Sequence, residues 1–249
     1  MSHDQLAWRK KFGVLAPSTN SIVEADFNKM NVPGVTPLFS RIHIYDQDLS
    51  SEAQMEKLRV QLDESIDHAI DLVCTAEVDY MVMGMSAETF WDGKDGNEAF
   101  KRRVKERSGG LDVATGAEGC ERALNKFGVK TIGVITPYQP NGDRQVIGFF
   151  EELGFEVTKL IGLKRPTAVS IAHTPEDELR DAILDIDRTE PDAIVQVGTN
   201  LSMVRLAAEA ERWLHKPVIA INAATWWMAL RDNGIEDKIY GFGRLLEEF

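Results

Sequence analysis

The chain has 249 residues, 43% of them hydrophobic and 27% charged, which is enough to bury one large core or two modest ones. Its net charge of −12 argues against a broad nucleic-acid surface, because binding to phosphates needs a concentrated basic footprint. The first residues include no apolar signal segment and no stretch approaches roughly 18 consecutive apolar residues, so we expect a cytoplasmic protein with no membrane span. The two cysteines, Cys74 and Cys120, form neither a disulfide framework nor a metal motif.

Short apolar runs alternate with longer amphipathic segments along the chain. The runs that predict strands are residues 12–16, 38–44, 80–85, 131–136, 155–162, 193–197 and 217–221. The segments with apolar residues at helical spacing are 51–76, 97–107, 117–127, 142–153, 176–188 and 202–214. This alternation predicts an α/β protein whose sheets are mainly parallel and flanked by helices.

Two helix starts carry specific signals. Ser21 and Glu24 have the spacing of a capping box, in which the serine hydroxyl would cap the helix. Thr174, Pro175 and the acids that follow place a cap residue, a first-turn proline and negative charges in order. These signals predict helices that begin near residues 22 and 175.

The two halves of the chain echo each other. FGVLAPSTN and YMVMGMS are separated by much the same distance as TIGVITPY and AIVQVGTN. We therefore expect two similar α/β lobes, the first made of residues 1–116 and 216–249 and the second of residues 117–215. No Gly/Ser-rich linker separates them, so we expect one compact body with a site in the cleft between the lobes.

Polar loops follow four of the predicted strands. Ligands of parallel α/β sheets bind outside the carboxyl ends of the strands, where backbone N–H groups and helix N-termini face the crevice. Here those ends carry residues 17–20, 84–86, 136–138 and 198–200, which are rich in hydroxyls, amides and glycine. Such loops supply neutral hydrogen-bond donors without a fixed positive charge, which suits a carboxylate and an enolate formed beside it.

Each of these residues also has a structural interpretation. Asn20 or Ser21 can simply cap a helix, and Ser86 or the 198–200 stretch can be ordinary turns, so it is their joint placement that favours a site. The histidines are weaker candidates; His173, which directly precedes a predicted cap, could lean over the crevice. No GxGxxG, Walker, HExxH or GxSxG pattern is present, so nucleotide-binding, zinc-protease and serine-hydrolase functions lack their usual support, and we expect no cofactor and no metal.

Four stretches resemble the aspartate/glutamate racemase superfamily, and within it the branch of maleate cis-trans isomerases and arylmalonate decarboxylases. They are LAPSTNSIVE (15–24), MGMS (83–86), ITPY (135–138) and the last segment with INAATWWMALRDNG and YGFGRLLEE. The resemblance implies two pseudo-symmetric α/β lobes. It also implies that Asn20 holds a substrate carboxylate, that Ser86 helps to form a dioxyanion pocket beside Met85, where a threonine is expected, and that Tyr138 belongs to the site.

The resemblance places glycines where members of this superfamily carry reactive cysteines. Racemases and isomerases of the superfamily use one cysteine from each lobe, and those places fall on Gly84 and Gly198. A thiolate attacks the alkene in maleate isomerisation and exchanges protons in racemisation, so the standard forms of both reactions lack their nucleophile here. Decarboxylation needs an apolar pocket for the departing carboxylate and donors for the enediolate that remains.

Our leading hypothesis is therefore an enzyme that acts on a small carboxylate or dicarboxylate through a stabilised enolate, as an arylmalonate-decarboxylase-like lyase. The alternatives are an isomerase or racemase whose acid and base are not cysteines, and a catalytically silent carboxylate-binding protein. The candidate catalytic side chains are Tyr138, Ser86 and His173, and the candidate binding residues are Asn20, Ser18, Gly84, Met85, Gly198, Thr199 and Asn200.

Several further assignments remain open at this point. Met85, Trp91, Trp226 and Trp227 are candidates for apolar walls, and the proton could come from Tyr138, His173, Glu88, Lys164 or a bound water. We expect a small carboxylate as partner and no nucleic acid or membrane. Because members of this branch often form dimers or larger assemblies, the resemblance is also compatible with a homo-oligomer.

Overall fold

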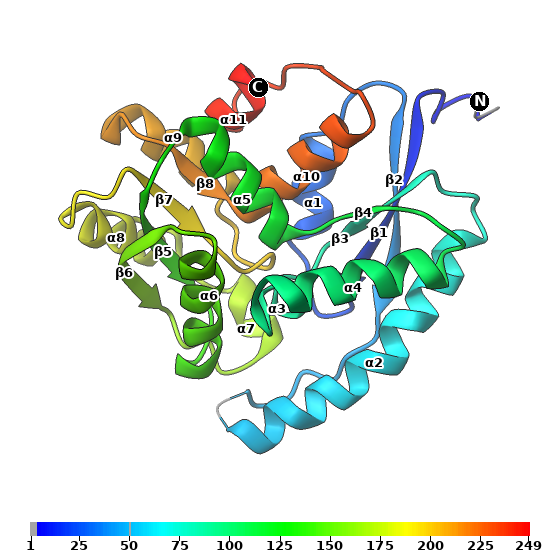
Figure 1. The fold of residues 1–249 in the computed structure, drawn as a ribbon, viewed down its shortest axis with the longest axis horizontal. Helices are drawn as coiled ribbons and strands as arrows, with labels where there is room; N and C mark the ends of the chain where they lie inside the picture. The colour runs from blue at the N-terminus through cyan, green and yellow to red at the C-terminus, as the bar shows by residue number, and fades with distance from the viewer. Residues whose placement is uncertain (1–3, 50) are drawn as a thin grey trace.

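The computed structural model describes residues 4–49 and 51–249, and it contains two parallel four-stranded sheets (Figure 1). The first sheet has the order β2-β1-β3-β4 and the second the order β6-β5-β7-β8. The strands are β1 (Lys10–Pro17), β2 (Val35–Ile42), β3 (Tyr80–Met83), β4 (Val113–Ala114), β5 (Thr131–Thr136), β6 (Glu156–Gly162), β7 (Ala193–Gln196) and β8 (Val218–Ala220). The second order repeats the first with every number raised by four, so the predicted pair of similar lobes is confirmed.

Helices flank both sheets and fill the space between them. They are α1 (Val23–Lys29), α2 (Glu52–Cys74), α3 (Ala87–Phe90), α4 (Gly93–Arg107), α5 (Gly116–Phe127), α6 (Pro140–Glu152), α7 (Ala168–Ala172), α8 (Glu176–Asp187), α9 (Val204–Leu214), α10 (Ile221–Asp232) and α11 (Arg244–Glu248). The six helical segments predicted from spacing correspond to α2, α4, α5, α6, α8 and α9. Within the described residues, no helix is long and apolar enough to cross a membrane.

The two predicted cap signals work differently from expectation. Helix α1 begins at Val23, and its free N–H groups are bonded by the side-chain oxygen of Asn20, which accepts from Ile22 N (2.9 Å) and Val23 N (3.0 Å). The capping box predicted at Ser21 is therefore wrong. At α8 the N-cap position belongs to Pro175, while the Thr174 hydroxyl donates to Ile171 O, so the threonine caps nothing. The predicted acids do occupy the first turn of α8.

Helix α10 joins the lobes. Strand β8, which precedes it, pairs with β7 in the second sheet, so the return of the chain to the first lobe begins only with α10. This helix packs against α5 and α1, and in Figure 1 it lies between the two sheets. The indole of Trp226 stacks on Phe27 of α1, with ring centroids 5.0 Å apart, and meets Phe12 of β1 edge-on. Buried apolar side chains of both lobes form one continuous cluster, so the lobes share a core.

Candidate functional site

A cavity of about 110 Å³ opens at the carboxyl ends of the strands, where the two lobes meet. Strands β1 and β3 are the central pair of the first sheet, and β5 and β7 are the central pair of the second. The loops that follow these four strands all contribute to the cavity wall, through Asn20, Ser86, Tyr138 and Thr199 among others. The four polar loops thus converge on one edge of the molecule, as predicted.

The Ser86 hydroxyl lies at the centre of the polar wall. Its oxygen is 2.6 Å from the Tyr138 hydroxyl, and the backbone N–H of Thr199 donates to it at 3.3 Å. Ser86 comes from the first lobe and its two partners come from the second, so the contact forms only when the lobes are docked. The position of Ser86 directly before α3 fixes its side chain on the cavity side.

Asn20 and Thr199 form a second contact between the lobes. The Asn20 amide donates to the Thr199 hydroxyl (3.1 Å), which in turn donates to the backbone oxygen of Gly84 (2.9 Å). Because the oxygen of the same amide accepts the α1 N–H groups, the amide cannot rotate without losing contacts at both ends. Asn20 therefore presents a fixed N–H edge to the cavity that it lines.

Asn200 is occupied by structural contacts. Its side-chain oxygen accepts from Ser21 N (3.1 Å), and its nitrogen donates to Ala168 O (2.9 Å) and Thr19 O (3.4 Å). These bonds connect the β1 loop, the β7 loop and α7. Asn200 lines the cavity, and its amide holds the cavity wall together from both lobes.

The two glycines at the expected cysteine positions differ in conformation. At Gly84 a side chain would be tightly packed, because an added Cβ would lie 3.0 Å from Leu15 O and 3.3 Å from the Ala16 Cβ, and these neighbours would have to move by a few tenths of an ångström. Gly198 has a φ of +107°, and an added Cβ would lie 2.5 Å from the Pro137 Cδ. The second loop is thus built around glycine, since an L-residue would be strained there and would collide with the proline.

Tyr138 is the titratable hydroxyl of the cavity. Burial raises the pKa of its phenol above the ordinary value, and the hydrogen bond with Ser86 opposes that shift only in part. The phenol is therefore protonated at neutral pH and can donate a hydrogen bond to an oxyanion. Its ring lies edge-on to Trp91, which forms an apolar wall with Met85.

A buried carboxylate supports the β7 loop from behind. The Asn222 amide of α10 donates both to Thr199 O (3.0 Å) and to the Asp26 carboxylate of α1 (2.9 Å). Burial raises the pKa of Asp26, and the bond from Asn222 lowers it by less. This connection ties the backbone of the site loop to both helices at the lobe junction.

Several predicted site residues lie outside the described lining of the cavity. The Ser18 hydroxyl exchanges hydrogen bonds with the backbone of Ile44 (3.2 and 3.1 Å), and the N–H of Gly84 donates to Leu15 O (2.7 Å). The backbone N–H of Gly84, a candidate binding residue, is therefore used within the first sheet and its loop. His173 is exposed at the end of α7 and is not among the residues that line the cavity, although Ala168 and Ile171 of that helix are.

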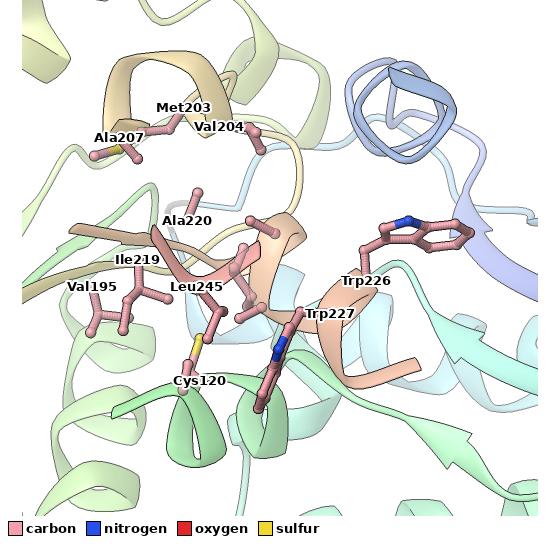
Figure 2. Packing of buried hydrophobic residues seen from close by; sticks show 14 of the residues in the cluster. Cys120, Val195, Met203, Val204, Ala207, Ile219, Ala220, Trp226, Trp227 and Leu245 are labelled. Atoms are coloured by element: carbon pink, nitrogen blue, oxygen red, sulfur yellow. The ribbon is translucent and has the colours of Figure 1, made fainter. Parts of the chain in front are cut away.

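The expected tryptophan walls need a similar correction, because Trp226 and Trp227 are core residues. Both are almost fully buried and project from α10 into the apolar cluster (Figure 2). Cys120 is buried in the same cluster and Cys74 lies in α2, and burial raises the pKa of both thiols. Neither cysteine of the chain lines the cavity.

Sequence reasoning missed one charged residue of the site, Arg165. We expected neutral donors without a fixed positive charge, yet Arg165 lines the cavity from the segment after β6. The signal was available, because this segment also follows the carboxyl end of a strand. Among the described residues, no group of three or more histidine, cysteine, aspartate or glutamate side chains is arranged to hold a metal ion.

Comparison with known proteins agrees with this geometry. The maleate isomerase of Pseudomonas putida is 21% identical over 248 residues, covering 95% of this chain and 96% of that protein. The maleate cis-trans isomerase of Nocardia farcinica, solved as a mutant with a covalently bound succinylcysteine intermediate, superimposes with a TM-score of 0.86 at 18% identity, covering 96% of this chain and 99% of that one.

The comparisons also include arylmalonate decarboxylase. A crystal structure of that enzyme matches with a TM-score of 0.77 at 20% identity and covers 95% of this chain and 98% of that one. The family model described as arylmalonate decarboxylase matches residues 41–246, which is most of the chain. The resemblance noted in the sequence is thereby confirmed, and the protein belongs to the arylmalonate decarboxylase family of the aspartate/glutamate racemase superfamily.

Proposed function

We propose that this protein is a cofactor-independent lyase that removes a carboxylate from a small substrate through an enediolate. The observation that carries the proposal is the pairing of a hydroxyl and amide cluster with apolar walls in a cavity whose described lining contains no thiol. Such a cavity can stabilise negative charge on oxygen, but it offers no thiolate for attack on carbon.

In the proposed reaction, one carboxylate of the substrate is held by Asn20, Ser86 and the Tyr138 hydroxyl. The carboxylate that leaves faces the apolar wall formed by Met85 and Trp91, where its charge is poorly solvated. The carbon–carbon bond breaks, carbon dioxide departs, and the electron pair of that bond moves into the retained carboxylate as an enediolate. The hydroxyl and amide donors stabilise its two oxygens.

A proton must then reach the carbon. Of the four side chains considered as proton donors from the sequence, Tyr138 is the one that lines the cavity. We propose that the Tyr138 O–H transfers its proton to the carbon, and that the resulting phenolate takes a proton from solvent through Ser86, to which it is hydrogen-bonded. The raised pKa of the phenol slows this step but does not prevent it, because an enediolate carbon is a much stronger base than a phenolate.

The second candidate is an isomerase, and the similarity of two curated maleate isomerases over 95% of the chain favours it. Isomerisation requires temporary loss of the double bond, so a nucleophile must add to one alkene carbon. With glycine at positions 84 and 198, a hydroxyl of the cavity, such as that of Ser86, would have to act as this nucleophile.

Proton NMR in deuterated water separates these functions in one experiment. The enzyme is incubated with phenylmalonate, with a malonate whose substituent carries a further carboxylate, with maleate and with a set of amino acids. Loss of carbon dioxide from either malonate, with one deuterium incorporated at the reacting carbon, supports the lyase. Conversion of maleate to fumarate without decarboxylation supports the isomerase and contradicts our first proposal. Deuterium exchange at a stereocentre indicates a racemase, and saturable binding without turnover indicates a silent binding protein.

A further inference from the structure

Arg165 is the one residue with a formal charge among the described residues that line the cavity. Its backbone is held firmly in place: the N–H donates to Pro137 O (2.9 Å), and the carbonyl accepts from the Gln139 amide (3.2 Å). The next residue back, Lys164, donates its N–H to Tyr138 O (3.2 Å). The base of the arginine side chain is therefore fixed relative to the Tyr138 loop.

The guanidinium of Arg165 has one buried donor without an acceptor. That donor is Nε, whereas the equally buried Nη2 has Glu178 as its partner. The Glu178 carboxylate of α8 forms an ion pair with Nη2, while 41% of the glutamate side chain is exposed. Nε and Nη2 lie on the edge of a guanidinium that can bind a carboxylate through two parallel bonds. Nε is a buried charged donor without an acceptor, which is unfavourable, so an anion that displaces Glu178 from Nη2 could bond both nitrogens of this edge.

We propose that Arg165 binds a second anionic group of the substrate, at a distance from the carboxylate held by Asn20, Ser86 and Tyr138. This inference rests on the proposed function, because it takes that first carboxylate as given. It narrows the substrate class to small acids that carry an additional carboxylate, or a group of like charge, on the part remote from the reacting carbon. Substrates whose remote part is a neutral aryl group would leave Nε of Arg165 without an acceptor and Nη2 paired with Glu178.

Glu178 allows a test in which two substitutions have opposite effects on anion binding. In the absence of an anion, its carboxylate partly neutralises Arg165 and competes for Nη2. Removal of the glutamate charge should therefore strengthen binding of an anionic group, whereas removal of the arginine charge should weaken it. If the pair served only to attach α8 to the segment after β6, both substitutions would disturb the site in the same direction.

Isothermal titration calorimetry with non-reacting acids tests this arrangement. The probes are succinate and glutarate, each compared with its monoamide, which keeps one carboxylate and replaces the other with a neutral group of similar size. We expect Arg165→Gln to weaken diacid binding roughly ten- to hundredfold and to leave monoamide binding almost unchanged. Glu178→Gln should tighten diacid binding. Arg188→Gln removes the same charge from an arginine whose side chain is 80% exposed, and it should change neither.

The outcomes that overturn the inference are also defined. The inference fails if the unmodified protein binds diacids and monoamides equally well, or if it binds none of the probes. It also fails if Arg165→Gln weakens the binding of both probe types equally, or if Glu178→Gln weakens diacid binding. Thermal unfolding of each variant checks that the fold is intact. Arg165-dependent diacid binding without turnover in the NMR experiment would reject the lyase and retain the anion site at Arg165. Decarboxylation that Arg165→Gln leaves unchanged would retain the lyase and reject the anion site.

Discussion

The Tyr138 hydroxyl carries two roles in the proposed reaction, as oxyanion donor and as proton source. Tyr138→Phe keeps the ring against Trp91 but removes the hydroxyl, while Ser86 still accepts from Thr199 N. We expect turnover to fall by roughly 10²- to 10³-fold or more, because loss of a single oxyanion donor has that effect in other enzymes. Initial-rate kinetics on the substrate identified by NMR measures it.

The control for this substitution is Tyr240→Phe, since Tyr240 is 74% exposed and is not among the residues that line the cavity. Its turnover and thermal unfolding should match those of the unmodified protein. If Tyr138→Phe kept full turnover with an unchanged fold, the proton would have to come from another group, such as a bound water.

The two glycines allow a direct comparison of tolerance to a cysteine. Gly84→Cys requires its neighbours to move by a few tenths of an ångström, whereas Gly198→Cys combines a positive φ with a collision against Pro137. We expect Gly198→Cys to lower the free energy of unfolding by roughly 2–6 kcal/mol, from backbone strain and overpacking together. Gly84→Cys should lose distinctly less.

Urea unfolding of the two variants measures this difference. Gly148→Cys in α6 is the matched control, because Gly148 is exposed and an added Cβ there meets nothing within 4 Å. Equal losses at positions 84 and 198 would contradict the distinction between the two loops. That outcome would mean that the second loop can adopt another conformation when a side chain is present.

At the scale of secondary-structure elements, the sequence predicted what local periodicity encodes. Helices such as α5 and α8 bury one face, and the resulting spacing of apolar residues identified them. Helix α10 gave no such signal, because ten consecutive residues from Ile221 to Leu230 are buried, so that no exposed polar face alternates with a buried apolar one. Strand β4 has two residues, which is too short for any alternation to show.

The sequence predicted those residues of the candidate site that directly follow the ends of strands. Asn20, Ser86, Tyr138 and Thr199 follow the four central strands, so an argument from sheet geometry brought them together. The side chains that were misplaced depend on tertiary packing and on the local geometry of a turn, which spacing does not encode. Trp226 is in the core because α1 and β1 enclose it, and the capping oxygen came from Asn20 rather than from Ser21.

The contact of Asn200 with α7 belongs to this scale, since one amide connects three elements. Asn200→Ala would leave Ser21 N and Ala168 O without their present partners, and we expect the free energy of unfolding to fall by about 1–3 kcal/mol. Because the same bonds position the cavity wall, KM should rise as well. Chemical denaturation and steady-state kinetics measure the two effects.

A matched control is Asn28→Ala, whose amide makes an exposed bond to Glu24 O on the surface of α1. Its unfolding free energy should stay within about 0.5 kcal/mol of the unmodified value. If Asn200→Ala kept its stability and lost only substrate affinity, the amide would be a direct ligand, as the sequence first suggested, rather than a link between elements.

At the scale of the whole molecule, the buried carboxylates determine how stability responds to pH. Burial raises the pKa of Asp26, Asp143 and Glu211 in the folded protein. As the pH falls through each folded pKa toward the ordinary values of 3.8 for aspartate and 4.5 for glutamate, the native state binds protons that the unfolded state does not. Stability must therefore rise on mild acidification, which also reduces the net charge of −12.

Other carboxylates act in the opposite direction at lower pH. Ion pairs and hydrogen bonds lower the folded pKa of Asp71, Asp185, Asp192 and Asp237 below 3.8. Their contribution to stability is fully present above that value and is lost as the pH falls through the folded pKa. The expected profile of unfolding free energy against pH has its maximum between these two ranges, on the acidic side of neutrality.

Asp26→Asn isolates one buried group in that profile. The asparagine can still accept the hydrogen bond from Asn222, but it carries no charge to desolvate. We expect this variant to be more stable than the unmodified protein near pH 7 and to gain less stability on acidification. Asp181→Asn makes the same charge change at an exposed position of α8, and it should leave the shape of the profile unaltered. Urea unfolding at a series of pH values measures this difference. If Asp26→Asn and the unmodified protein gained equal unfolding free energy on acidification, Asp26 would not contribute to the increase in stability. The reduction of the net charge would then produce it.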